Sequence, residues 1–166
     1  MLRSSLPSES SALLGVAVAT GLFEPESAEA LLGNILSELH ADRLGAGHTV
    51  AVWAAADRRA EGWVYYAPDA YAAQVWNLWW IGVSPDSQGK GIGRALLERV
   101  EAHVSASEGR LLIIETSSTP PLARARAFYR QNGYAECGHI PDFYAVGDGK
   151  VIFAKRLDVA VPIGGA

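Results

Sequence analysis

The stretch IGVSPDSQGKGIGRALLERV, residues 81–100, runs from strand-like apolar residues through a glycine-rich turn into an amphipathic helix. Glycines stand at three alternate positions of the turn, Gly89, Gly91 and Gly93. Each glycine costs conformational entropy on folding, so their concentration at a helix start needs a reason. A turn into a helix exposes unpaired backbone N–H groups and the positive end of the helix dipole, which suits phosphate. Lys90 and Arg94 add positive charge there.

Three phosphate-binding patterns compete for this turn. The Walker A loop requires G-x-x-x-x-G-K-[ST], which neither the turn nor its flanks provide. A dinucleotide fingerprint requires G-x-G-x-x-G at the first strand–helix turn, whereas this turn reads G-x-G-x-G and follows an expected hairpin. The third pattern, Q-x-x-G-x-G, is filled by Gln88, Gly91 and Gly93. A plain strand–helix connection is the remaining alternative, although one glycine would suffice for it.

Hydrophobic periodicity predicts the elements before the turn. We expect a strand at 2–5, a helix at about 8–20 with Ser8 as its N-cap, a helix from Glu24-Pro25-Glu26 to about 41, and a hairpin of strands 49–56 and 62–67. The stretch 74–83 is apolar on both alternating faces, which predicts a central strand covered on both sides.

After the turn the same patterns predict a helix, a strand at 111–116, a helix ending at Asn132-Gly133, and strands at about 134–140 and 151–157. A tight turn is expected in the last loop at Asp148-Gly149. No repeat or domain boundary is evident. We therefore expect a single domain over residues 1–166, with its core at about 2–158 and a short frayed tail.

The segment V-x-P-x-x-Q-G-K-G-I-G-R-A-L-L resembles the coenzyme A-binding signature of the GNAT acyltransferase superfamily. Downstream, ARAFYRQNGY resembles the family's A-x-x-FY-x-x-x-GY/F segment, and the expected order of elements also matches. The resemblance covers nearly the whole chain. It implies an α/β (mixed α+β) fold: a central mixed, mostly antiparallel sheet, about four helices and a splayed pair of central strands.

The resemblance also implies acetyl-CoA as co-substrate. Backbone N–H groups of the turn would hold its pyrophosphate, at the positions Gln88, Gly89, Lys90, Gly91, Ile92, Gly93 and Arg94. The end of the preceding strand would pair with the pantetheine amides, at Ile81, Gly82 and Val83. Gly82 suits that role because a missing side chain permits a bulge or a close approach.

Acyl transfer to an amine needs a neutral amine, a stabilised oxyanion and a proton for the departing thiolate. Tyr129 matches the family position whose hydroxyl serves as that general acid; aromatic packing beside Phe128 is the alternative. Many relatives carry a basic carboxylate on the central strand, where this chain has Asn77. Glu115 is the nearest substitute by element order, while an ion pair of Glu115 with a surface arginine and a base drawn from solvent remain alternatives.

The loop IPDFYAVGDGK joins the last two expected strands. In this architecture it could overhang the acceptor, with Asp142 attracting the amine and Phe143 and Tyr144 forming a wall. A plain hairpin whose aromatic residues cap the core is the alternative. The five tryptophans are expected mostly in the core, with one or two facing the acceptor pocket.

Bulk properties exclude several classes of function. The net charge of −4 argues against nucleic acid as main partner. A single cysteine, Cys137, permits no internal disulfide and favours the cytoplasm. Residues 12–19 are apolar and could imitate a signal peptide, but they also fit an early helix, and no run is long enough to span a membrane. The histidines show no metal-ligand spacing, so no metal is expected.

The resemblance implies an N-acetyltransferase that moves acetyl directly from acetyl-CoA to a primary amine. The acceptor is a small molecule, a peptide or a protein amine. A coenzyme A-binding sensor or interaction module without turnover is the alternative. Since relatives are often dimers, a homodimer is one expected state.

Overall fold

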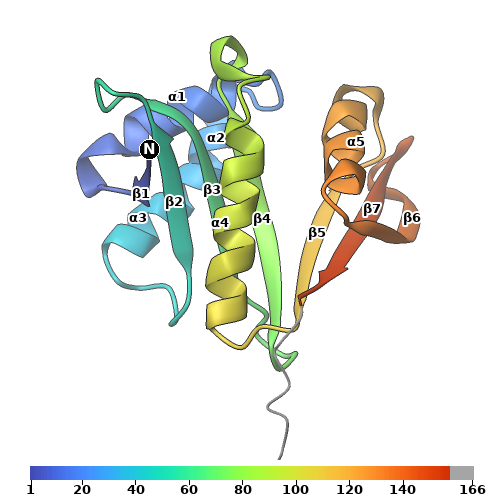
Figure 1. Cartoon of the computed structure of the whole chain (residues 1–166). Coiled ribbons are helices and arrows are strands. Elements are labelled where there is room, and N and C mark those ends of the chain that lie inside the picture. The colour runs from blue at the N-terminus through green and yellow to red at the C-terminus, as the bar shows by residue number, and fades with distance from the viewer. Residues whose placement is uncertain (158–166) are drawn as a thin grey trace, which may run out of the picture. The chain divides into compact units, whose positions relative to one another are not determined.

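The computed structural model describes residues 1–157 of the 166-residue chain. Figure 1 shows the elements in chain order: β1 (Leu2–Ser4), η1 (Pro7–Glu9), α1 (Ser10–Ala19), α2 (Pro25–Ala28), η2 (Glu29–Gly33), α3 (Asn34–His40), β2 (Thr49–Ala54), β3 (Ala60–Pro68), β4 (Val75–Val83), η3 (Pro85–Ser87), α4 (Ile92–Ala106), β5 (Leu111–Ser117), η4 (Pro120–Leu122), α5 (Ala123–Gln131), β6 (Ala135–Ala145) and β7 (Asp148–Arg156). The expected tail lies outside the described residues.

The seven strands are ordered β1-β2-β3-β4-β5-β7-β6. The pairs β1–β2, β2–β3, β5–β7 and β6–β7 are antiparallel. Because α2, η2 and α3 follow one another without a break, residues 1–157 contain four helices besides short 3-10 turns, as predicted. The described residues form two compact units: unit 1 is Met1–Pro68 with Leu78–Val100, and unit 2 is Asp69–Asn77 with residues 101–157. The mixed α/β fold with a mostly antiparallel sheet is thus confirmed.

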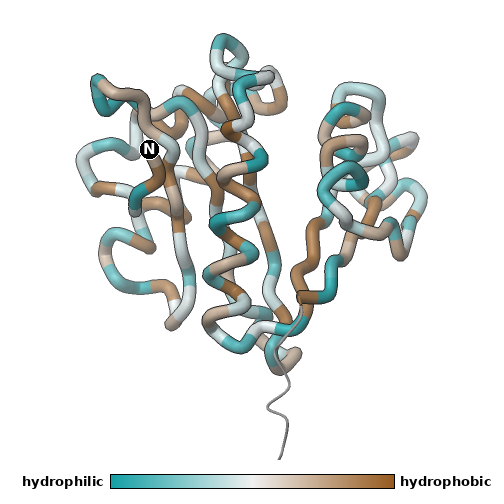
Figure 2. Tube along the Cα trace, in the orientation of Figure 1, coloured by the Kyte–Doolittle hydropathy of each residue, from teal (hydrophilic) through white to brown (hydrophobic). Residues whose placement is uncertain are grey.

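Helices cover both faces of the strands of unit 1. On one face, apolar residues of α1, η2 and α3 pack with strand residues into one core: Leu13, Val16, Ala17, Leu32, Leu36, Val50, Val52, Ala60, Trp63, Tyr65 and Trp80. The Trp63 indole donates a hydrogen bond to the Leu13 carbonyl at 2.8 Å, which fixes α1 to β3. On the opposite face a side chain at Gly62 would meet Ile92 of α4. Hydrophobic and hydrophilic residues alternate along α4 in Figure 2, as in an amphipathic helix.

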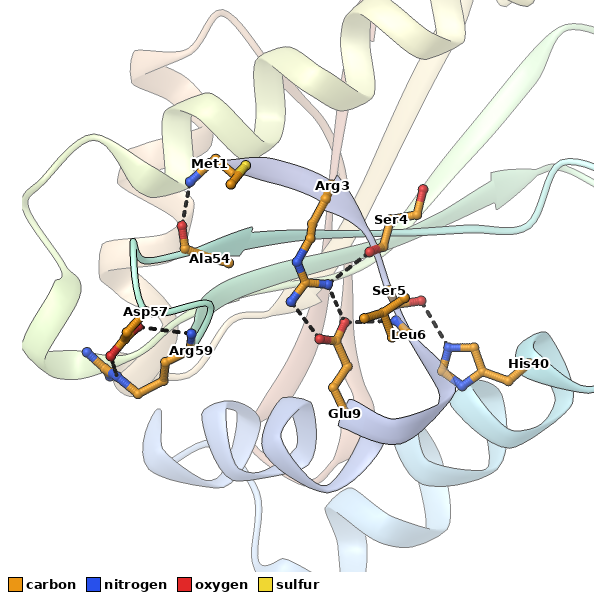
Figure 3. A network of polar contacts seen from close by, with 10 residues as sticks. All are labelled: Met1, Arg3, Ser4, Ser5, Leu6, Glu9, His40, Ala54, Asp57 and Arg59. Carbon is orange, nitrogen blue, oxygen red and sulfur yellow. Dashed lines mark hydrogen bonds and ion pairs between the residues drawn. The ribbon is translucent and has the colours of Figure 1, made fainter.

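Polar contacts tie the start of the chain to η1 and α3 (Figure 3). The Arg3 guanidinium donates to both Glu9 carboxylate oxygens, at 2.8 and 2.6 Å. Glu9 also accepts from the Leu6 amide at 2.9 Å, and Ser5 Oγ lies 3.0 Å from His40 Nε2. The predicted Ser8 cap is wrong: Ser8 lies inside η1, and α1 starts at Ser10 without a side-chain cap. The Glu9 carboxylate instead caps η1 through the Leu6 amide.

β4 is covered on both sides only in its first half. Val75 to Leu78 are buried, but Trp79 is 55% exposed and Ile81 and Val83 are half-buried. The prediction of a strand covered throughout is therefore wrong from Trp79 onward. A continuous apolar run does not reveal which of its residues other elements cover.

The β6–β7 hairpin of unit 2 turns earlier than predicted. β6 continues to Ala145 and β7 begins at Asp148, so the turn falls at Val146-Gly147 rather than at Asp148-Gly149. Gly147 adopts a left-handed φ of 81°. Its amide donates to Asp142 Oδ1 at 2.6 Å, which fixes the turn. Gly149 lies inside β7, where a Cβ would approach the Ile140 carbonyl oxygen to 2.8 Å.

Asn77 and Asp69 form a structural pair in unit 2. Asp69 Oδ1 accepts from the amides of Tyr71 and Ala72, and Asp69 Oδ2 accepts from Asn77 Nδ2, each at 2.9 Å. The backbone bond from Tyr71, then the bonds from Asn77 and Ala72, lower the pKa of Asp69 below its ordinary value. Asn77 thus holds the loop before β4 through Asp69.

We expect Asp69→Ala to raise amide exchange at Tyr71 and Ala72 by about tenfold or more, because both lose their acceptor. A lowered folded pKa means that the Asp69 contribution is complete above the ordinary carboxyl pKa and is lost as pH falls through the lowered value. Hydrogen exchange followed by NMR measures this. Asp57→Ala, which removes a similar bond to the Arg59 amide, serves as control and should leave Tyr71 unchanged.

Candidate functional site

The glycine turn of unit 1 is anchored at its start. The Ser84 amide donates to the Glu61 carbonyl at 2.8 Å, and Ser87 Oγ donates to Glu61 Oε1 at 2.9 Å. Gln88 Nε2 donates to the Val83 carbonyl at 3.2 Å, which closes the turn back onto β4. Ser87 is buried, so the turn leaves β3 and β4 at a fixed place.

Two of the three glycines take conformations that other residues rarely adopt. Gly89 and Gly91 have φ of +77° and +79°, and a Cβ on either would meet no atom within 4 Å. The Ala95 amide donates to the Gly91 carbonyl at 3.0 Å, so α4 begins directly after Gly91 and contains Gly93 in its first turn. Glycine is therefore required for backbone shape, and the space beside it is open.

Six successive amides follow Gln88 in this turn. Within residues 1–157, the amides of Gly89, Lys90 and Gly91 have no hydrogen-bond acceptor. The amides of Ile92, Gly93 and Arg94 are the first three of α4, which have no acceptor inside a helix. The Lys90 side chain is exposed. Arg94 forms an ion pair with Glu98, in which Arg94 Nε lies 2.8 Å from Glu98 Oε1. These donors at the positive end of a helix of 15 residues fit a pyrophosphate.

Gly82 makes room for a tryptophan. A Cβ at Gly82 would collide with the Trp80 indole, two residues earlier on the same face of β4. The missing side chain thus permits a close approach to the backbone, as expected. The group that approaches is the indole of Trp80. Among the other positions predicted for pantetheine, Ile81 is half-buried, and the Val83 carbonyl already accepts from Gln88.

Gly82→Ala is expected to lower the free energy of unfolding by about 1–3 kcal/mol, because the rigid indole must move within a packed core. Chemical denaturation followed by tryptophan fluorescence measures the loss. Gly15→Ala is the matched control, since a Cβ at Gly15 in α1 meets no atom within 4 Å and alanine favours helix. Equal stabilities of the two variants would contradict the account of Gly82.

Tyr129 lies in α5 of unit 2, with its ring in an aromatic cluster. The side chain is 6% exposed, and its ring centroid lies 5.5 Å from that of Phe153 and 6.3 Å from that of Tyr134. Its hydroxyl has no hydrogen-bond partner within residues 1–157. Over the same residues, only Trp80 Nε1 is both fully enclosed and unpartnered, so the Tyr129 hydroxyl remains accessible. Burial raises the pKa of Tyr129, which keeps the hydroxyl protonated.

Glu115 lies on β5 of unit 2 and is paired with a lysine. Lys150 Nζ lies 2.5 Å from Glu115 Oε2, and 3.8 Å from the centre of the Phe143 ring. Phe143 and Tyr144 are half-exposed and contact each other edge to face. Asp142 holds the hairpin turn through Gly147. The structure thus groups Glu115 with the predicted acceptor aromatics through Lys150, and it leaves those aromatics uncovered.

The sequence did not predict a cavity of about 340 Å³ in unit 1. Seven residues line it: Phe23, Leu31, Leu32, Ile35, Tyr65, Trp79 and Trp80. The signals in the sequence were Leu31, Leu32 and Ile35 at helical spacing and the adjacent tryptophans at positions 79 and 80. In the described part of the chain, no cluster of acidic, histidine or cysteine residues could hold a metal, and no helix could cross a membrane.

Known proteins resemble this chain both in sequence and in fold. The acetyltransferase (GNAT) domain family matches residues 47–136. No curated protein matches the chain in sequence. Among solved structures, a protein assigned to the GNAT family from Desulfovibrio desulfuricans is 30% identical, with a TM-score of 0.89 over 95% of this chain and 99% of that chain.

Two further structures share the fold at lower identity. The ribosomal-protein-S18-alanine N-acetyltransferase of Escherichia coli is 19% identical, with a TM-score of 0.77 over 100% of this chain and 99% of that one. An aminoglycoside 6'-N-acetyltransferase complexed with coenzyme A is 16% identical, with a TM-score of 0.75 over 95% and 97%. The domain match and the 30% identical structure lead to one conclusion: the chain belongs to the GNAT family of acetyltransferases.

Proposed function

We propose that the chain transfers an acetyl group from acetyl-CoA directly to a primary amine, with no covalent enzyme intermediate. The observation that carries this proposal is the run of open amides from Gly89 to Arg94 at the start of α4. Such a run binds a diphosphate without side-chain charges. Ile81, Gly82 and Val83 would bind the pantetheine arm.

The residues of the chain have separable roles in this reaction. The amine nitrogen bonds to the acetyl carbon while the carbon–sulfur bond breaks, and the Tyr129 hydroxyl supplies the proton that the departing sulfur takes up. Its raised pKa keeps that proton in place until the transfer. The ion pair of Glu115 with Lys150 favours a water molecule over Glu115 as acceptor of the amine proton.

The net charge and the similar structures bear on the acceptor and the partners of the enzyme. The net charge of −4 favours a cationic or small polar amine over an acidic acceptor, and it argues against nucleic acid. Small molecules and proteins both occur as acceptors in the names of the similar structures. Asp142, Phe143 and Tyr144 would border the acceptor. We further propose one domain acting in the cytoplasm, alone or as a homodimer.

Thiol release from acetyl-CoA, measured with a panel of primary amines, tests the proposal. Release that depends on the amine, with the acetylated product identified by mass spectrometry, is expected. Coenzyme A binding without release by any amine would favour a sensor or interaction module instead. Calorimetric titration with coenzyme A supplies the binding measurement.

A further inference from the structure

We propose that the acceptor is a small primary amine with one apolar group, and that this group binds the cavity of unit 1. The inference rests on the proposed function and names the substrate class of the same enzyme. It is carried by the apolar, uncharged lining of the cavity and by the position of the cavity along β4.

The lining suits an apolar group of about the size of a phenyl ring. None of the seven lining residues carries a charge, and five of them are aliphatic or tryptophan residues that offer only carbon surface or an indole. The volume of about 340 Å³ falls within the range of ligand pockets. A cavity of about 150 Å³ already holds benzene in another protein, so a phenyl or branched alkyl group fits with room for its linker.

The polar groups at the cavity are neutral. Tyr65 in the lining has its hydroxyl 2.7 Å from His48 Nδ1, and the two rings stack. Burial raises the pKa of Tyr65 and lowers the pKa of His48, so neither group is charged near neutral pH. A second cationic group, as in a polyamine, would find no counter-charge among the lining residues.

Trp80 adds apolar surface to the lining. Its side chain is 7% exposed, and its ring centroid lies 5.3 Å from that of Phe23 and 5.7 Å from that of Trp63. Within residues 1–157, its indole Nε1–H is the only fully enclosed side-chain polar atom without a partner, so the indole presents no accessible polar atom to a group in the cavity. The lining at Trp80 therefore favours an apolar group.

The cavity also lies next to the strand end proposed for the cofactor. Trp80 precedes Ile81, Gly82 and Val83 directly, and its indole packs over Gly82. Strand residues advance by about 3.3 Å each, so a group beside Trp80 lies within a few residues of the proposed pantetheine strand. A short linker between amine and apolar group is enough to span this distance.

The test compares kcat/KM for 2-phenylethylamine with kcat/KM for ethanolamine. Wild-type protein should favour 2-phenylethylamine by about tenfold or more, since a phenyl group leaves water. Leu31→Asp should reduce that preference at least tenfold. Leu31 is 57% exposed, so its replacement leaves the core intact. Leu22→Asp is the matched control: Leu22 is 39% exposed, does not line the cavity, and should retain the preference.

Each outcome decides between the two proposals. Equal use of both amines, or an unchanged preference in Leu31→Asp, overturns the cavity assignment while acetyl transfer stands. Acetylation of a tripeptide with N-terminal phenylalanine but not of 2-phenylethylamine overturns the small-molecule class. If no amine releases thiol, the proposed function fails. Calorimetric binding of 2-phenylethylamine then tests the cavity alone: binding that Leu31→Asp removes supports it, and no binding to wild type overturns it.

Discussion

Gly91→Val is expected to weaken acetyl-CoA binding by about 100-fold or more, equivalent to about 3 kcal/mol. Gly91 has a φ of +79°, and the space beside its Cα is open to a ligand. A valine side chain would fill that space and disfavour the backbone shape that directs the neighbouring amides toward one point. Calorimetric titration with acetyl-CoA measures the loss.

The control for this variant separates backbone strain from lost binding. Gly21 has a φ of +74° with no atom within 4 Å of a built Cβ, so Gly21→Val pays a similar conformational cost of about 1–3 kcal/mol. Both variants should therefore lose similar stability, but only Gly91→Val should lose affinity. Wild-type affinity in Gly91→Val would disprove the assignment of the turn as the pyrophosphate site.

Tyr129→Phe is expected to lower kcat by about 100-fold, the lower end of the range for a lost general acid. The Tyr129 hydroxyl has no partner within residues 1–157, so its removal should change stability by less than about 1 kcal/mol. The KM for acetyl-CoA should stay constant, because the ring is retained. Steady-state kinetics and thermal denaturation measure both quantities.

Tyr134→Phe provides the matched control on a neighbouring ring. The Tyr134 hydroxyl donates to Glu101 Oε1 at 3.0 Å, so this variant should lose about 1 kcal/mol of stability and keep its kcat. Since burial holds the pKa of Tyr129 above its ordinary value, the ratio of wild-type to Tyr129→Phe rates should stay constant from about pH 7 to 9. A ratio that approaches one in that window would remove Tyr129 from the acid role.

Most of the fold could be predicted from the sequence, because the hydrophobic periodicity and the turn residues indicated the same helices and strands. The change from helical to alternating periodicity at Thr49 marks β2, and the glycine turn marks the start of α4. Gly133, with a φ of 84°, follows the end of α5 as its sequence context predicted. In each case a local rule and the tertiary structure favour the same conformation.

The sequence failed where a residue's neighbours lie far away in the chain. The exposure of Trp79 depends on which residues of other elements pack over it, and the hairpin turn depends on Asp142 reaching Gly147. Neither signal is periodic. The pairing of Glu115 with Lys150 likewise comes from the register of β5 with β7, which a single sequence does not reveal. The catalytic and acceptor roles therefore remain predictions to be tested by the variants above.

The proposed anion site at the start of α4 is composed of main-chain atoms. Reagents that acylate lysines or amidate carboxylates would leave those amides in place, so chemical labelling would pass over this site. A complete mutational scan would register it mainly at Gly89 and Gly91, the two positions with left-handed φ, and would find the exposed Lys90 and Arg94 tolerant. The site is thus encoded in backbone conformation, and substitutions that alter its charge would reveal less than those that add a single methyl group.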